Sequence, residues 1–206
     1  QAAVEVDLSG IDEREREIVA DGHALTLHLV RRHGSRGRPP YFVFIHGGGW
    51  VLGDYPTHRR LVRDLVVESE VAAVFVDYTP SPEAKYPQAV DEIYAAVKWV
   101  AENDAELDLD RRRMAFVGNS AGGNMALAAA LLAKKRHAPA VRALVLLWPV
   151  TSASSDWKSY ALYGGERFLT APLMKWMFDR YTTDARAREE ILRSPVNASR
   201  EERFGL

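Results

Sequence analysis

Short apolar runs alternate along this chain with amphipathic stretches of helical period, and this alternation restricts the fold more than any other feature. Such runs predict buried strands, and the intervening stretches predict helices that cover a mainly parallel sheet on both faces. We expect the first strand to lie at an edge, because its apolar residues alternate, and the last strand to be buried. The predicted strands are 24–30, 41–45, 71–76, 114–117 and 141–147, and the predicted helices are 58–68, 89–102 and 121–136.

The character of the sequence changes after residue 151. Residues 157–191 are rich in aromatic side chains and helical in pattern, without a predicted strand. We therefore expect one α/β domain over residues 1–206, in which residues 151–193 form a cap inserted over a site. Most of its aromatic side chains should build the core of the cap: Trp157, Tyr160, Tyr163, Phe168, Trp176, Phe178 and Tyr181.

Composition and charge exclude several classes of function. The absence of cysteine excludes disulfides, thiolate metal sites and a cysteine nucleophile. A formal net charge of -1 gives no electrostatic reason to expect nucleic acid or an anionic membrane as partner. No apolar run reaches the roughly 18 residues of a membrane-spanning helix, and residues 1–3 do not read as a signal peptide. These features do not identify the compartment, and we favour a cytoplasmic location.

The strongest local motif is Gly118-Asn119-Ser120-Ala121-Gly122-Gly123, which follows a predicted strand and opens a predicted helix. In this context Gly-x-Ser-x-Gly is typical of a nucleophile elbow, a strained turn that projects the serine hydroxyl from the sheet. The glycines allow strand and helix to approach closely, and the helix N-terminus places amide donors near a developing oxyanion. The alternatives are a turn with an incidental serine or a phosphate-binding turn, although the spacing of the nucleotide-binding glycine motifs is absent.

A second motif, His46-Gly47-Gly48-Gly49-Trp50, follows the predicted strand 41–45 directly. Successive glycines leave the backbone amides uncovered, so these amides could donate to a reacting carbonyl oxygen. The alternative is a flexible turn. Both motifs stand at the carboxyl ends of parallel strands, where open α/β sheets place their ligand sites. Together they predict an active site with Ser120 as nucleophile.

With these motifs the chain resembles the hormone-sensitive-lipase family of α/β-hydrolases, in its bacterial carboxylesterase branch. Beyond the two glycine motifs, Asp77-Tyr78, Ser81-Pro82-Glu83 and Tyr86-Pro87 are similar to a conserved family segment. The resemblance implies hydrolysis of carboxylic esters through an acyl-enzyme, without cofactor, metal ion or nucleotide. It also implies a compact cap suited to small, short-chain esters, with a few cap aromatics lining an apolar pocket.

By the same resemblance, backbone amides from Gly47, Gly48, Gly49 and Ala121 form the oxyanion hole. We prefer Gly48 and Gly49 as the donors from the glycine segment. The sequence departs from the family at Asn119, where the family usually carries aspartate. Asparagine keeps the size and hydrogen-bonding capacity of that side chain, so we expect activity to survive the difference.

A larger departure concerns the rest of the catalytic triad. The family carries its acid and histidine after a Gly-Leu-Pro-Pro connection, and this sequence stops at 205–206, where that connection would begin. His137 lies 17 positions after Ser120, past the predicted helix and so roughly 25 Å away. His46 reads as support for its loop, His58 as a residue at the entrance, and Asp156 as a weak alternative acid. The triad acid and histidine are therefore predicted to be absent from these residues.

We accordingly expect the 206 residues to be an incomplete chain that is almost inactive alone. Without its closing strands it should expose a sheet edge and apolar surface, and pair with the missing C-terminal segment or with another copy. Two other functions remain open. One is a non-catalytic small-molecule binding protein of the same fold, and the other is an amidase or lactonase.

Overall fold

The computed structural model describes residues 6–165, 167–182, 184 and 186–203. Six strands form one sheet: β1 Ile11–Ala20, β2 His23–Arg32, β3 Tyr41–Ile45, β4 Ala72–Asp77, β5 Met114–Asn119 and β6 Ala143–Leu147. The helices are α1 Tyr55–Ser69, α2 Gln88–Glu102, α3 Ala121–Lys135, α4 Lys158–Tyr163, α5 Ala171–Tyr181 and α6 Arg200–Arg203. Three single-turn 3₁₀ helices are η1 Arg111–Arg113, η2 Ala187–Glu189 and η3 Pro195–Asn197.

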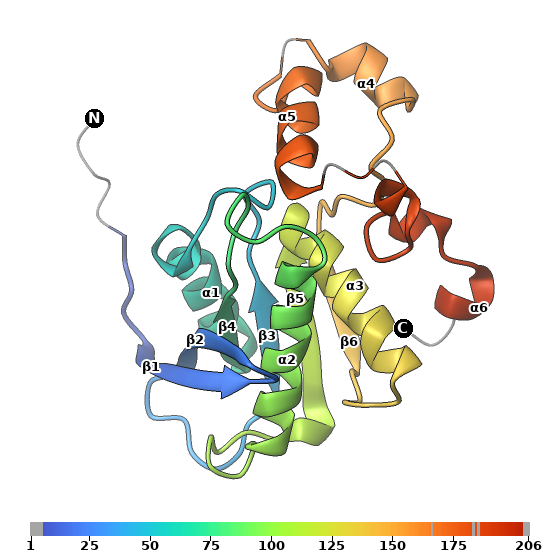
Figure 1. The fold of residues 1–206 in the computed structure, drawn as a ribbon. Coiled ribbons are helices and arrows are strands. Elements are labelled where there is room, and N and C mark those ends of the chain that lie inside the picture. Colours follow the sequence, from blue (N-terminus) through green and yellow to red (C-terminus); the bar gives the residue numbers. More distant parts are fainter. Residues whose placement is uncertain (1–5, 166, 183, 185, 204–206) are drawn as a thin grey trace.

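The strand order across the sheet is β1-β2-β4-β3-β5-β6. The pairs β3–β4, β3–β5 and β5–β6 are parallel, whereas β1–β2 and β2–β4 are antiparallel. Helix α1 covers one face, and α2 and α3 cover the other (Figure 1). The α/β fold with a mostly parallel sheet and helices on both faces is thereby confirmed. The parallel strands end at one edge, so the loops after β3 and β5 meet there.

The first strand of the sheet is one that the sequence analysis missed. Strand β1 pairs with β2 along its whole length, through a hairpin turn at Asp21-Gly22 in which both residues have positive φ. The expectation that strand 24–30 lies at an edge is therefore wrong, because β2, which contains these residues, lies between β1 and β4. Strand β1 is mostly exposed, and this explains why its sequence carries so few apolar residues.

Helix α1 begins earlier than its apolar period indicates. Asp54 caps its N-terminus by accepting a hydrogen bond from the Thr57 amide, and the Thr57 hydroxyl receives one from the Asp54 amide. Pro56 occupies the first turn, where a missing N–H costs nothing. This reciprocal capping box fixes the orientation of α1 behind the glycine segment.

The expectation that the last predicted strand is buried is wrong. Every residue of β6 is exposed or partly exposed, and Val145 has 44% of its surface accessible. Within the described residues β6 pairs with β5 alone, so its other edge has no partner strand. Its apolar composition therefore reflects a strand built to be covered on both sides.

The segment after β6 contains short helices and no strand in its described residues. Helices α4 and α5 stand above the sheet, and η3 and α6 run down beside α3 (Figure 1). Helix α5 approaches the glycine segment closely, because a Cβ added to Gly49 would lie 2.1 Å from the Met177 sulfur. None of the helices in the described ranges is long and apolar enough to cross a membrane.

Candidate active site

Ser120 occupies the sharp turn between β5 and α3. Its backbone has φ 53° and ψ −120°, a strained conformation for a residue other than glycine. The Ser120 amide donates to the Leu147 carbonyl at 2.9 Å, and the Ser120 carbonyl accepts from Val150 and Asn124. The turn is thus held from β6 and from α3, which leaves the hydroxyl at the end of the sheet.

Two glycines permit this turn. A Cβ on Gly118 would lie 2.5 Å from the Gly122 carbonyl oxygen, and a Cβ on Gly122 would lie 2.0 Å from the Ile45 carbonyl oxygen. Both contacts are with backbone, so no side chain could move aside. The close approach of strand and helix at these positions agrees with the elbow geometry expected from the sequence.

The glycine segment after β3 lies beside this turn. The Gly47 amide donates to the Asn119 Oδ1 at 2.9 Å, so it is already engaged. In the described part of the chain, the amides of Gly48, Gly49 and Ala121 have no hydrogen-bond acceptor. Gly48 has φ 126° and Gly49 has φ 61°, conformations that glycine adopts at little cost. This geometry favours Gly48 and Gly49 over Gly47 as donors to a ligand oxygen.

His46 supports the glycine segment from below. It is 1% exposed, its Nδ1 lies 2.8 Å from the Gly47 carbonyl oxygen, and its ring stacks against Tyr78 and Phe75. Burial lowers the pKa of His46 to about 4, so the ring is neutral at pH 7. A neutral Nδ1–H therefore donates to Gly47. His46 acts on the loop, as the sequence analysis predicted.

His58 reaches the site from the first turn of α1. Its Nε2 lies 3.4 Å from the Nδ2 of Asn119, and its Nδ1 faces the hydroxyl of Thr57 at 3.0 Å. Burial lowers the pKa of His58 below its ordinary value. The structure thus places His58 against Asn119, which the sequence analysis did not predict because 61 residues separate them.

The remaining candidates lie elsewhere. His137 is exposed just beyond the end of α3, and Asp156 is exposed and accepts a hydrogen bond from the Ser154 hydroxyl at 3.1 Å. In the part of the chain that the structure describes, the Ser120 hydroxyl forms no hydrogen bond with a histidine. The same residues contain no group of three side chains suited to hold a metal ion.

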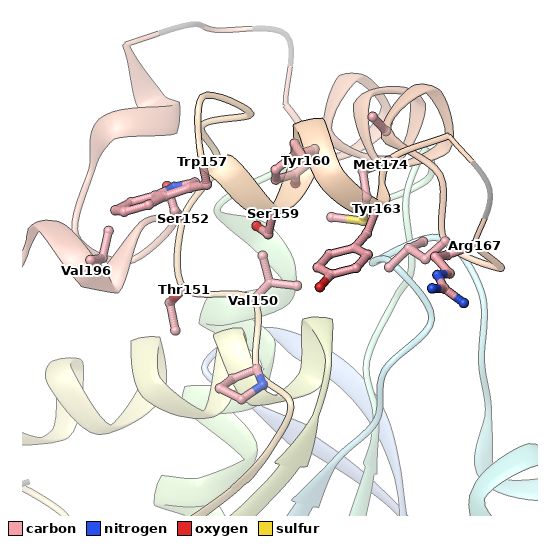
Figure 2. Close-up of a pocket in the computed structure, with 14 residues that line it drawn as sticks. Val150, Thr151, Ser152, Trp157, Ser159, Tyr160, Tyr163, Arg167, Met174 and Val196 are labelled. Atoms are coloured by element: carbon pink, nitrogen blue, oxygen red, sulfur yellow. The ribbon is translucent and has the colours of Figure 1, made fainter.

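A cavity of about 620 Å³ lies between the residues after β6 and helices α4 and α5. Figure 2 shows Val150 and Thr151 beneath it, with Trp157 and Val196 on one side and Tyr163 and Arg167 on the other. Val150 also donates its amide to the Ser120 carbonyl, so the cavity floor is one hydrogen bond from the elbow.

The aromatic side chains of this segment divide into three groups. Trp157, Tyr160 and Tyr163 line the cavity. Phe178 and Tyr181 are buried and pack on Trp50, with a stacked Trp50–Tyr181 pair at 4.9 Å between centroids. Phe168 and Trp176 are exposed, and so are Trp157 at 51% and Tyr163 at 55%. The expectation that most of these side chains build the core of the cap is therefore wrong. Helix α5 therefore packs through its aromatic residues onto the residue that follows the glycine segment.

Arg193 is a feature that the sequence analysis missed. Its side chain is fully buried, and in the described residues its guanidinium nitrogens have no hydrogen-bond partner. The cation instead lies 4.5 Å from the centre of the Tyr181 ring and 5.8 Å from that of Trp50, and burial lowers its pKa to about 10. Cation–π attraction offsets part of its desolvation. No local sequence signal distinguishes this arginine from a solvated one.

A serine on a strained strand-to-helix turn, beside free amides of a glycine loop at the carboxyl edge of a mixed sheet, defines the α/β-hydrolase class. A family model described as alpha/beta hydrolase fold matches residues 42–205. The chain belongs to this family, in the branch related to hormone-sensitive lipase, as its motifs indicated.

The relatives of this chain include esterases of bacteria and fungi. The chain is 32% identical to an ethyl acetate hydrolase of Pseudomonas putida over 189 residues, 87% of this chain and 57% of the relative. It is 40% identical to the carboxylesterase NlhH of Mycobacterium tuberculosis over 125 residues, 61% of this chain and 39% of the relative. The chain thus spans about half the length of the curated relatives that it matches.

The chain is more similar in sequence to some solved structures than to these two relatives. A crystal structure of a variant of the esterase rPPE with (S)-Ac-CPA bound has a TM-score of 0.97 and 54% identity, and covers all of this chain. A thermostable esterase from Pseudomonas putida ECU1011 has a TM-score of 0.96 and 55% identity over 98% of this chain. In both cases the match spans 64% of the other protein.

Proposed function

We propose that this protein is a serine carboxylesterase in which Ser120 attacks the ester carbonyl. One observation carries the proposal: the strained Ser120 turn lies beside the Gly48, Gly49 and Ala121 amides, which have no acceptor in the described residues. Hydrogen-bond donors that are already in position where negative charge develops lower the barrier of acyl transfer. The esterase names of the relatives support the same reaction.

The reaction proceeds in two steps. Ser120 forms a bond to the carbonyl carbon while a base takes its proton, and the alcohol leaves with a proton returned to it. Water then attacks the acyl-enzyme and releases the acid. In each step the oxyanion accepts from the amides of the glycine loop and Ala121, and the fixed position of these amides avoids reorganisation.

We propose further that the base is none of the six histidines of this sequence. His46 donates to Gly47, His58 contacts Asn119, and His137 is exposed beyond α3. His23, His28 and His33 all lie on β2 or directly after it, at the opposite side of the sheet from β6. The histidine and acid of the triad would then come from residues outside these 206, as the 64% coverage of esterase structures suggests.

We infer that the substrate is a small ester with a short acyl chain. The cavity of about 620 Å³ beneath the proposed cap, residues 151–193, is open to solvent and is lined mainly by apolar and aromatic groups. A cavity of this size suits a ligand of modest size. Tyr163 and Arg167 at one side add polar groups that orient such a ligand (Figure 2).

The test is hydrolysis of p-nitrophenyl butyrate by the 206-residue chain and by the product of the complete gene, each beside its Ser120→Ala variant. We expect turnover only in the complete product, and a loss of about 10⁴- to 10⁶-fold in its Ser120→Ala variant. Turnover by the 206-residue chain that disappears in Ser120→Ala would show that a base is present, and would overturn the assignment of the triad.

The second candidate is a binding protein of the same fold without catalysis. A cavity lined mainly by apolar and aromatic side chains would serve such a protein equally well. Under this function the complete gene product would bind a short-chain ester in the cavity without hydrolysing it. Calorimetric titration with the substrate, followed by analysis for released acid, separates the two functions.

A further inference from the structure

Asn119 connects two segments that are distant in sequence. Its Oδ1 accepts from the Gly47 amide at 2.9 Å, and its Nδ2 lies 3.4 Å from the Nε2 of His58. A Cβ on Gly47 would lie 2.7 Å from the Asn119 carbonyl oxygen, so the glycine loop is pressed against this residue. The side chain at 119 therefore lies between α1 and the glycine segment Gly47 to Gly49, which we call the oxyanion loop from here on.

The hydrogen bonds fix where the protons are. Because Oδ1 accepts from Gly47, the other end of the amide must be the donor, and His58 Nε2 must accept. The proton of the neutral ring is then on Nδ1, which faces the Thr57 hydroxyl at 3.0 Å and the Asp54 carbonyl at 3.3 Å. These two acceptors belong to the capping box of α1. A directed chain thus runs from Gly47 through Asn119 and His58 to the start of α1.

We propose that His58 is a positioning residue for the oxyanion loop. His58 holds the Asn119 amide in the one orientation that anchors Gly47. The proposal rests on the proposed esterase function, in which Gly48 and Gly49 need a fixed position. Without an acceptor at His58 Nε2, only the bond to Gly47 holds the Asn119 amide. The orientation of the amide is then less fixed, and the anchor of the loop is weaker.

Acid should have the same effect as removing the acceptor. The titratable groups facing His58 are His46, at 5.4 Å between ring centroids, and Asp54 at the start of its own helix. The other neighbours are uncharged, namely Phe44, Phe75, Thr57 and Asn119. A protonated His58 carries a donor on Nε2, opposite the Asn119 Nδ2 donor. This contact favours a rotated amide, in which Oδ1 faces His58 and the NH₂ group faces the Gly47 N–H.

The side chain at 119 sets which ring nitrogen carries the proton. Asparagine offers one acceptor and one donor, whereas aspartate offers acceptors only. In Asn119→Asp, one carboxylate oxygen would still accept from Gly47 and the other would face His58 Nε2. His58 would then carry a proton on Nε2, and its pKa would rise because of the adjacent carboxylate.

The first experiment is nuclear magnetic resonance of the 206-residue chain, which requires no turnover. We expect ¹⁵N shifts of His58 typical of an Nδ1–H ring at pH 7, and of Nε2 protonation in Asn119→Asp. Amide exchange at Gly47 should become about 5- to 10-fold faster in His58→Leu, the size expected for one lost hydrogen bond. His58→Gln should restore the slow rate, because its side-chain oxygen can accept near the position of Nε2.

Two comparisons separate positioning from general destabilisation. In an Asn119→Ala background, His58→Leu should have no further effect on Gly47, because the intermediate link is gone. His33→Leu serves as the matched control, since His33 is exposed and bonded to Asp12 away from the loop. A Gly47 exchange rate unchanged by His58→Leu, or a wild-type His58 with Nε2–H, would overturn the proposal.

The second readout is activity of the complete gene product. We expect His58→Leu to lower kcat about 5- to 10-fold with little change in KM, since the oxyanion forms after binding. His58→Gln should recover most of the rate, and His33→Leu should leave it unchanged. If the complete product hydrolyses no ester, the proposed function fails while the Gly47 measurements still decide the positioning role. Hydrolysis with equal kcat in wild type and His58→Leu would overturn the positioning role alone.

Discussion

Single residues determine whether the turn at Ser120 can form. Gly122 is the most restrictive of them, because its missing Cβ leaves room for the backbone at the end of β3. Ser120 itself is held at positive φ by hydrogen bonds to Leu147, Val150 and Asn124. The strain of this turn is therefore compensated by bonds from two neighbouring elements.

We expect Gly122→Ala to be severely destabilising. Its Cβ would lie 2.0 Å from the Ile45 carbonyl oxygen, so β3 or α3 must shift, at a cost of about 3 kcal/mol or more. Urea unfolding measures this loss. Gly165→Ala is the matched control, because no atom lies within 4 Å of its added Cβ. Equal midpoints for the two variants would contradict the close packing of the elbow.

The buried His46 makes stability depend on pH. Its pKa of about 4 in the folded state lies below the 6.5 of the unfolded chain, so the unfolded state binds the extra proton first. The contribution is complete above pH 6.5 and falls as the pH drops toward 4, by roughly 3 kcal/mol in all. Unfolding in urea at several pH values measures the slope. His46→Phe should keep the ring stacking and reduce this slope, and an unchanged slope would contradict the assignment.

At the scale of elements, α5 packs directly against the glycine segment and Trp50, the residue that follows it. Met177 of α5 fills the space where Gly49 lacks a side chain, and Trp50 stacks on Tyr181 of the same helix. The position of the proposed cap and the shape of the proposed oxyanion loop are therefore coupled by direct contact.

A pair of substitutions tests this contact. Gly49→Ala should destabilise the protein by about 1–2 kcal/mol because of its positive φ, with a further loss from the clash with Met177. In a Met177→Ala background the clash is absent, so the cost of Gly49→Ala should fall to the free energy lost through the positive φ alone. Thermal unfolding of the four proteins gives the coupling. Strictly additive effects would show that α5 does not pack on the loop.

Much of the fold could be predicted from the sequence because buried strands and amphipathic helices leave strong periodic patterns. Strand β1 could not, since its mostly exposed residues read as a charged surface segment. The available signal was Asp21-Gly22 between two extended runs, a pair typical of tight hairpins. The exposure of β6 was equally hidden, because burial depends on what packs beside a strand rather than on its own residues.

The candidate site, like the fold, could be predicted from the sequence only in part. The positions of Ser120 and the glycine segment follow from local motifs, each contained within a few residues. The contact of His58 with Asn119 and the aromatic surroundings of Arg193 join segments far apart in sequence. Such contacts depend on how elements pack, and no single sequence window contains them.

At the scale of the whole molecule, the side of the sheet at β6 exposes large apolar side chains. Val145 is 44% exposed and Trp148, just after the strand, is 71% exposed. In the described residues no strand pairs with the free edge of β6. An edge with exposed apolar residues is a template for pairing with another strand.

We therefore expect the 206-residue chain to self-associate at micromolar concentration through this edge. Val145→Lys should reduce association, because a charge on an exposed strand opposes edge-to-edge pairing. Sedimentation velocity over a range of concentrations measures the effect. Leu162→Lys is the comparison, since Leu162 is 72% exposed on α4 rather than on the strand. A similar reduction by both variants would show that association does not depend on β6.

The central claim is that Ser120 is the nucleophile, and labelling with a phosphorylating ester analogue tests it most directly. The complete gene product would be treated with diethyl p-nitrophenyl phosphate, digested, and mapped by mass spectrometry. The account predicts one diethylphosphoryl group on Ser120, in step with loss of p-nitrophenyl butyrate hydrolysis. Loss of activity with the label on another residue, or hydrolysis that persists after Ser120 is fully labelled, would contradict it.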